Sequence, residues 1–256
     1  MPRAQKKSNT LSEPGSRLVR LNKYLSTAGF SSRRKADKLM EEGRVTVNGK
    51  IITSLGTKID PSSDKIFVDG KQIVALDEPV YIVFNKPKDA ITTAKDERGR
   101  ATIMDYVHVR ERVYPVGRLD RKTTGVLLLT NDGEFANGLM HPRHEVKKAY
   151  TVTLDKPMEP SDAKHLAAGI RLSDGKTKPA EVQLVPGGKN KVVGVVIHEG
   201  RNRQIHRMFE ALGYVVEKLD RVAYAEITYQ GVPRGRWRHL TKGEVRQLKV
   251  IAGMGE

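Results

Sequence analysis

The first part of the chain spaces its apolar residues as two short helices do. Leu21, Tyr24 and Leu25 recur at positions i, i+3 and i+4, which predicts one buried helix face. Either Ser31 or Ser32 then offers a side-chain oxygen to the free N–H groups at the start of a second helix. That second helix is expected to bury a stripe of three residues, Ala36, Leu39 and Met40.

Strand-like alternation follows, with two dipeptides that predict hairpin turns. Asn48-Gly49 lies inside RVTVNGKII, and Asp69-Gly70 lies inside IFVDGKQIV. Asn, Asp and Gly accept the positive φ that both central residues of a tight hairpin turn need. We therefore expect a small α/β domain over residues 18–75, with a short linker after it.

The remainder of the chain alternates strand-like runs with short helical ones. VYIVFNKP has the pattern of an apolar strand stopped by Pro87, and GVLLLTNDG is a continuous apolar run, typical of a strand buried on both faces. Helical spacing returns in RQIHRMFEALG, and no regular βαβ period is present. These features predict a second domain over residues 79–250, of the α+β class, with a mixed or antiparallel sheet.

Composition restricts the possible functions. The chain of 256 residues has no cysteine, which excludes disulfides, thiolate zinc sites and cysteine nucleophiles. It also has no run of about 18 apolar residues, which a membrane-spanning helix requires. Residues 1–17 lack the apolar core of a secretory signal, and we interpret them as a basic flexible tail. A cytoplasmic location is therefore expected.

Positive charge is the strongest compositional signal. The net charge is +16, and the first 50 residues hold 12 lysines and arginines against 4 acidic residues. A polyanion is the natural partner, because each phosphate that a cation neutralises releases counterions and adds affinity. The predicted second helix and the hairpin turn after it would present five cations to phosphate oxygens: Arg33, Arg34, Lys35, Lys38 and Lys50.

The same segment resembles a known RNA-binding module. RLNKYLSTAGFSSRRKADKLMEEGRVTVNGK is similar to the small RNA-binding domain that a small-subunit ribosomal protein shares with several RNA-modifying enzymes. The shared features are the order of the two helices, the Ser-Arg-Arg start of the second helix and the Val-x-Val-Asn-Gly turn. The resemblance implies recognition of structured RNA rather than duplex DNA.

One acidic residue in the second domain contrasts with its basic surroundings. Asp120 lies between Arg118 and Arg121, in a predicted loop between two strands. Loops carried by rigid strands often hold catalytic groups, and neighbouring cations favour the ionised carboxylate that a nucleophile needs. Residue types and spacing alone leave a second interpretation open, in which Asp120 closes a turn as one half of an ion pair.

The segment around Asp120, GRLDRKTTGVLLLTNDG, closely resembles the central signature of pseudouridine synthases of the RsuA and RluB group. In that family the Asp of Gly-Arg-Leu-Asp is the catalytic residue, so the resemblance implies this role for Asp120. EVKKAYTVTL is similar to the family's Lys-x-Tyr segment and implies that Tyr150 stacks on the target base. A third match, VYIVFNKPKDAITT, departs from the family at Asp89, where glycine is usual.

A late segment, EGRNRQIHRMFEALG, resembles the family's strand-to-helix junction. In the family this junction supplies a basic residue that pairs with the catalytic aspartate. Arginine is common there, whereas this chain has His206. Either His206 takes the role as an imidazolium, or Arg207, Arg203 or Arg118 does; the sequence leaves these alternatives open.

The resemblance implies an enzyme that isomerises a uridine of ribosomal RNA to pseudouridine. No redox step is needed, and the chain has no glycine-rich dinucleotide or phosphate loop, so no cofactor is expected. His141 and His144 form a His-x-x-His pair, but with no third ligand in view we interpret them as part of a solvated loop and expect no metal site.

The resemblance also implies the class of RNA. The chain is most similar to large-subunit enzymes of the RluB type, with the small-subunit RsuA type as an alternative. A ribosome-assembly factor that binds RNA but has lost catalysis is a second alternative. The expected partner is ribosomal RNA or a ribosome assembly intermediate, bound by a monomer, and neither DNA nor a membrane.

Overall fold

The computed structural model describes residues 18–255 apart from 75–77, 94–95 and 97–98. The expected basic tail, residues 1–17, lies outside the described residues. Contacts divide the chain into two units, residues 1–77 and residues 78–256. No helix in the described part of the chain is both long and apolar enough to cross a membrane.

The first unit packs two helices against short strands. The helices are α1 (Leu21–Thr27) and α2 (Arg33–Glu41). One strand pair joins β1 (Val19–Arg20) to β4 (Lys58–Ile59). A four-stranded antiparallel sheet has the order β3 (Lys50–Ile51), β2 (Val45–Val47), β5 (Ile66–Val68) and β6 (Lys71–Ile73).

The local predictions for this unit are confirmed. Both apolar stripes, one on each helix, are buried in its core. Ser32 is the residue that caps α2, because its hydroxyl accepts from the backbone N–H of Lys35 at 3.2 Å. All four residues of the two turn dipeptides have positive φ, as their hairpins require.

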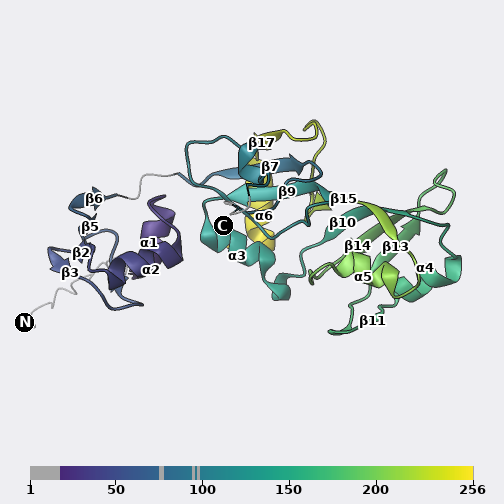
Figure 1. Ribbon diagram of the computed structural model, residues 1–256, viewed down its shortest axis with the longest axis horizontal. Helices are drawn as coiled ribbons and strands as arrows, with labels where there is room; N and C mark the ends of the chain where they lie inside the picture. Colours follow the sequence, from purple (N-terminus) through teal and green to yellow (C-terminus); the bar gives the residue numbers. More distant parts are fainter. Residues whose placement is uncertain (1–17, 75–77, 94–95, 97–98, 256) are drawn as a thin grey trace, which may run out of the picture. The chain divides into compact units, whose positions relative to one another are not determined.

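The second unit is built on one large mixed sheet (Figure 1), as predicted. Along the order β13-β14-β10-β15-β9-β7-β17, only β15 and β9 are parallel neighbours among the described strands. β8 also pairs with β9, and β16 with β15. The strand bounds are β7 (Tyr81–Lys86), β8 (Tyr114–Pro115), β9 (Thr124–Thr130), β10 (Lys148–Leu154), β13 (Glu181–Leu184), β14 (Val192–Ile197), β15 (Val216–Tyr224), β16 (Ile227–Thr228) and β17 (Trp237–His239).

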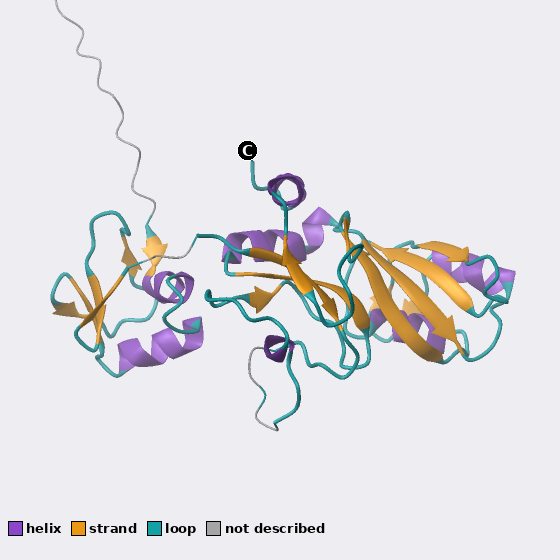
Figure 2. Cartoon of the chain, turned by 90° about the horizontal axis from the view of Figure 1, so that it is seen from above, coloured by secondary structure: helices purple, strands orange, loops and turns teal. Residues whose placement is uncertain are grey.

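Helices cover the sheet, with α3 and α6 beside the half formed by β7 and β9, and α4 and α5 beside the half formed by β10 and β14 (Figures 1 and 2). Their bounds are α3 (Gly133–Met140), α4 (Pro160–Ala167), α5 (Gln204–Glu210) and α6 (Lys242–Ile251). Two 3-10 turns, η1 (Ile103–Asp105) and η2 (Pro142–His144), and a hairpin of β11 (Arg171–Leu172) and β12 (Gly175–Lys176) complete the unit.

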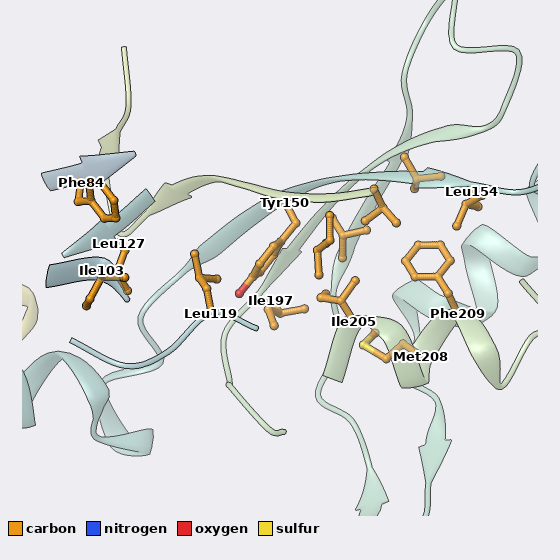
Figure 3. Packing of buried hydrophobic residues seen from close by; sticks show 14 of the residues in the cluster. Phe84, Ile103, Leu119, Leu127, Tyr150, Leu154, Ile197, Ile205, Met208 and Phe209 are labelled. Carbon is orange, nitrogen blue, oxygen red and sulfur yellow. The ribbon is translucent and has the colours of Figure 1, made fainter. Parts of the chain in front are cut away.

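Strand β7 shows why the sheet needs cover on both faces. Ile82 and Phe84 belong to one apolar core, with side chains of α4 and α5, and Figure 3 shows part of this core. Tyr81 and Val83 belong to a second core, with side chains of α3 and α6. Because successive strand residues point to opposite faces, a continuous apolar run requires a core on each side. The prediction that the apolar run of β9 is buried on both faces is confirmed in the same way.

The start of α6 is fixed by a capping box with an ion pair attached. Glu244 accepts from the backbone N–H of Thr241 at 2.7 Å, and Thr241 accepts from that of Glu244 at 3.2 Å. Arg238 donates to both carboxylate oxygens of Glu244 at 2.8 Å. The hydrogen bonds from Arg238, followed by those from Thr241, lower the pKa of Glu244 to about 2, against the opposing effect of burial.

We expect the substitution Glu244→Gln to lower the free energy of unfolding near pH 7 by about 1–2 kcal/mol. The folded pKa of Glu244 lies below its ordinary value of 4.5. Its contribution is therefore complete above the unfolded pKa and is lost as pH falls from about 4.5 towards about 2. Urea unfolding at a series of pH values checks this, with the exposed Glu226 changed to Gln as the matched control. An unchanged pH dependence in Glu244→Gln would contradict the assignment.

Candidate active site

A pocket of about 500 Å³ opens in the second unit, beside the centre of the sheet. Its wall is formed by the loop before β9, by the end of α3, by β10, by β15 and by the junction between β14 and α5. Asp120 and Tyr150, which the sequence analysis selected from segments 30 residues apart, both line this pocket. Arg118, Arg203 and His206 line it as well.

Asp120 lies in the loop between β8 and β9, as predicted. Its backbone carbonyl accepts from the Thr123 N–H at 3.1 Å, which closes a turn. One residue earlier, Leu119 exchanges hydrogen bonds with the hydroxyl of Thr92, at 2.7 Å from its carbonyl and 3.3 Å from its N–H. The loop backbone is thus held in place, while the Asp120 side chain remains 40% exposed and accessible to a ligand.

A buried lysine donates hydrogen bonds to the backbone of the loop that carries Asp120. The ammonium group of Lys86, at the end of β7, donates to the carbonyls of Thr123 at 2.8 Å, Pro87 at 3.1 Å, and Asp120 and Arg121 at 3.2 Å each. Its side chain is fully buried. Desolvation lowers the pKa of Lys86 to about 8, although nearby carboxylates oppose this. Lys86 was not among the site residues expected from the sequence, although a lysine at the end of an otherwise apolar strand is a signal that could have identified it.

The two arginines that flank Asp120 in the sequence, Arg118 and Arg121, do not form an ion pair with it in the described structure. Arg121 does not pair with Asp120 but with Asp89, at 3.0 Å between Nε and Oδ1. Asp89 has a φ of 68°, the left-handed region in which glycine is common, and Asp89 also donates its N–H to the Arg121 carbonyl. The departure from the family's glycine therefore keeps the conformation that glycine would take and adds an ion pair. Arg118 is exposed at the pocket.

Arg203 is the cation that the structure brings nearest to the Asp120 carboxylate among the alternatives left open. Its Nη1 lies 3.9 Å from Oδ2 of Asp120, and its Nη2 lies 3.7 Å from Glu210. Arg203 immediately precedes α5 and has a φ of 46°. This left-handed turn between β14 and α5 directs the side chain to the pocket.

The other two alternatives at the junction have different surroundings. Burial, and then the charge of Arg203, lower the pKa of His206, which favours a neutral ring and disfavours an imidazolium. Nδ1 of His206 is buried without a hydrogen-bond partner among the residues that the structure describes. Arg207 points to the β11–β12 hairpin, where its Nη2 lies 2.9 Å from Asp174.

Tyr150 lies in β10 and is 8% exposed. Figure 3 shows its ring between Leu119 and Ile197, with the hydroxyl end on the side of Leu119. Across the sheet Tyr150 pairs with Arg221 of β15. A flat aromatic face in the pocket wall is suited to stacking on a base.

Arg221 and Lys148 also line the pocket and were missed by the sequence analysis. Arg221 is 2% exposed, and its Nε donates to the Val126 carbonyl at 2.7 Å. Lys148 donates to the Val146 carbonyl at 2.7 Å. In the sequence each is a charged residue within a strand of otherwise alternating pattern. Only the three-dimensional arrangement of β10 and β15 brings both to this pocket.

The cationic residues proposed for RNA binding in the first unit are all on its surface. Arg33, Arg34, Lys35 and Lys38 are exposed on α2, and Lys50 is exposed in β3. Lys38 lies 3.8 Å from Glu42, a pair between two solvent-exposed side chains.

The histidine pair after α3 is held by local hydrogen bonds, and of the two only His141 lines the pocket. His144 shares a hydrogen bond of 2.8 Å with the Gly138 carbonyl through Nδ1 and accepts from Arg143 at Nε2. His141 accepts from the backbone N–H of Arg143 at 3.3 Å. Among the described residues, no group of three or more His, Asp or Glu side chains has the arrangement of a metal site.

Comparisons with known proteins agree on one family. Residues 80–211 match the RNA pseudouridylate synthase family, and residues 19–72 match the S4 domain. Ribosomal large subunit pseudouridine synthase B of Bacillus subtilis is 46% identical, over 93% of this chain and 99% of that protein. The dual-specificity RNA pseudouridine synthase RluF of Escherichia coli is 37% identical, over 90% and 78% respectively. A crystal structure of a pseudouridylate synthase superposes with a TM-score of 0.66 at 31% identity, covering 90% of this chain and 99% of that one.

Proposed function

The chain belongs to the RNA pseudouridylate synthase family and carries an S4 domain, and from this premise we propose that it converts a specific uridine of large-subunit ribosomal RNA to pseudouridine. The observation that carries the proposal is the accessible Asp120 carboxylate, held in a rigid loop beside Tyr150 and Arg203 in one pocket. The name of the Bacillus subtilis relative supports the choice of the large subunit.

The reaction breaks the bond from N1 of uracil to C1′ of ribose and joins C1′ to C5, which then loses its proton. Asp120 is the reacting carboxylate in this proposal, either as a nucleophile or as the base that removes a ribose proton. Tyr150 stacks on the uracil ring. Because a base inside a helix cannot reach the pocket, the target uridine must be unpaired or flipped out, and flipping is least costly at an unpaired site.

The remaining pocket residues have supporting roles in the proposal. Arg203 pairs with the Asp120 carboxylate, in place of the arginine that is common in the family at the position of His206. His206 contacts the substrate as a neutral ring, and the exposed Arg118 contacts RNA beside the target uridine. Arg207 has a positioning role in the proposal, because its ion pair with Asp174 ties the junction to the β11–β12 hairpin.

Release of tritium from RNA labelled at uridine C5 tests the function. Large-subunit and small-subunit ribosomal RNA, and assembly intermediates of each, are supplied separately to the purified chain. We expect release from the large-subunit substrate. Release from the small-subunit RNA alone would favour the other substrate class, and binding without any release would favour an RNA-binding assembly factor.

The S4 domain is proposed to hold the RNA through α2. We expect replacement of Arg33, Arg34 and Lys35 by Gln to weaken RNA binding about tenfold or more near physiological salt, because each lost phosphate contact removes one counterion-release contribution. A plot of the logarithm of affinity against the logarithm of salt concentration has a negative slope, and its magnitude should decrease by about 2–3. Filter binding at several salt concentrations measures both quantities.

The matched control neutralises three other exposed lysines of the same unit, outside α2. We expect this variant to bind RNA within about threefold of the wild type, since it keeps the α2 cations. Equal weakening in the two variants would mean that net charge, rather than the α2 surface, determines affinity. The control residues are Lys58, Lys65 and Lys71.

The proposal also includes the partner, the oligomeric state and the location of the protein. Ribosomal RNA or a ribosome assembly intermediate is the partner, the chain acts as a monomer, and the reaction takes place in the cytoplasm, where ribosomes are assembled.

A further inference from the structure

Positive charge gathers at the active-site pocket, because Arg221 and Lys148 line it and Lys86 lies behind the loop that carries Asp120. Lys86 and Arg221 are almost completely buried, and Lys148 is partly buried. None of these three belongs to an ion pair within 4 Å among the described residues. Desolvation first, and then the charge of Arg221, lower the pKa of Lys148 to about 8. Nearby carboxylates act on Lys86 and Lys148 only through space, with Asp120 the larger influence on Lys86 and Glu199 on Lys148. Buried cations without a carboxylate in direct contact are costly, so this cluster is suited to a ligand that brings or develops negative charge.

Arg221 is the member of this cluster with unused hydrogen-bonding capacity. Its Nε is occupied by the Val126 carbonyl, but its Nη2 is buried without a partner among the described residues. Lys86, in contrast, donates to four carbonyls, and Lys148 donates to Val146. A guanidinium N–H that finds no acceptor within the protein is available to an acceptor on the substrate.

The sheet holds Arg221 at this place by two irregularities. On the side of β10, Ala149 pairs with Ala223 but Tyr150 pairs with Arg221, so Val222 is an extra residue in β15. Such a bulge redirects side chains and is common next to active sites. On the side of β9, Arg221 pairs with Gly125, where an added Cβ would lie 2.2 Å from the Arg221 carbonyl oxygen. The glycine thus permits β15 to approach the end of the Asp120 loop closely.

The chemistry of the proposed reaction places negative charge on the uracil ring. If Asp120 attacks C1′ of the ribose, the N1–C1′ electron pair leaves with uracil, which becomes an anion. If Asp120 instead removes the C2′ proton, the same bond breaks and uracil again departs as an anion. If Asp120 adds to C6 of the ring, the electrons move to the C4 carbonyl as an enolate. In each route a hydrogen-bond donor beside the ring oxygens stabilises the charge, and a cationic donor does so most strongly, whichever bond Asp120 forms.

We propose that Arg221 is a catalytic residue that donates to a carbonyl oxygen of the target uracil and stabilises the negative charge that the ring acquires during isomerisation. The inference rests on the proposed function. Arg221 lies opposite Tyr150 in the strand pairing and both residues line the pocket, so the guanidinium and the base stacked on Tyr150 would share that pocket. The assignment is separate from that of Arg203, which approaches the Asp120 carboxylate.

Single-turnover rates on two RNAs test the proposal. One RNA carries uridine at the target position, and the other carries 5-fluorouridine, whose ring anion is intrinsically more stable. With uridine, we expect Arg221→Gln to lower the rate by about 100-fold, the scale on which removal of one charge-stabilising donor acts. With 5-fluorouridine the loss should shrink to about tenfold or less, because the leaving ring depends less on the cation. Loss of the N1-linked nucleoside after digestion measures both rates.

Three readouts separate this role from a structural one. Arg221→Lys, which keeps the charge, should recover part of the rate. RNA affinity should stay within about twofold in both variants. Arg238→Gln removes an arginine that is paired with Glu244 outside the pocket, and its rates on both RNAs should match the wild type.

Equal losses on the two RNAs, together with a lowered melting temperature, would overturn the assignment and make Arg221 a structural residue of the sheet. An unchanged rate in Arg221→Gln would overturn it as well. A wild-type chain that is inactive on both RNAs would instead contradict the proposed function on which the assignment rests.

Discussion

Replacement of Asp120 by asparagine is expected to reduce pseudouridine formation by about 10⁴-fold or more, the scale on which loss of an essential reacting group acts in other enzymes. The amide is nearly isosteric with the carboxylate but is neither a competent nucleophile nor a base. Because the Asp120 side chain is 40% exposed and its loop is held by backbone hydrogen bonds, the variant should fold normally. Tritium release measures the reaction.

RNA affinity distinguishes this expectation from loss of substrate binding. We expect Asp120→Asn to bind RNA within about twofold of the wild type, because phosphate contacts supply most of the affinity. Asp89→Asn is the matched control, since Asp89 is a comparably exposed aspartate that pairs with Arg121 in the same region. Retention of more than about 1% of the wild-type rate by Asp120→Asn would show that another group carries the reaction.

The parts of the fold that depend on neighbouring residues could be predicted from the sequence. The turn at Asn48-Gly49 needs only two residues that accept positive φ, and Ser32 caps the helix that begins one residue later. The apolar run of β9 likewise reports burial on both faces without knowledge of its partners. Local chemistry determines each of these features.

The site was only partly predictable, because its remaining members meet through strand pairing. Asp120 and Tyr150 were found from segments that resemble the family. Arg221 was not, because its position depends on a bulge in β15 and on its pairing with Gly125, 96 positions away in the sequence. Such long-range pairing has no signature in the local spacing of residues.

The choice among the basic residues at the β14–α5 junction shows the same limit. Arg203 and Arg207 are four residues apart and have the same side chain, yet they point to different partners. The left-handed backbone at Arg203 and the position of Asp174, 33 residues before Arg207, determine the difference. Neither could be predicted from the residue types, so the sequence left the alternatives open.

Replacement of Lys86 by methionine is expected to lower both stability and activity. Methionine fills a similar volume but donates no hydrogen bond, so the carbonyls of Pro87 and Thr123 lose their side-chain donor. The carbonyls of Asp120 and Arg121 keep only a backbone N–H as partner. At about 1–3 kcal/mol for each buried group left unsatisfied, offset in part by relief of lysine desolvation, the free energy of unfolding should fall by about 3 kcal/mol. The loop that carries Asp120 then loses its fixed geometry, and the rate should fall by about 10³-fold.

A control of equal instability separates positioning from general destabilisation. Leu248 is 1% exposed in the core between α6 and the sheet, and Leu248→Ala should cost about 3 kcal/mol through the cavity that it creates. Urea unfolding measures both variants, and tritium release is then compared at a temperature where each is folded. Because Leu248 does not line the pocket, its variant should keep its rate within about threefold. Equal rates in the two variants would show that Lys86 supports the fold but not the geometry of Asp120, whereas a selective loss in Lys86→Met means that the ammonium group fixes the backbone from which the catalytic carboxylate projects.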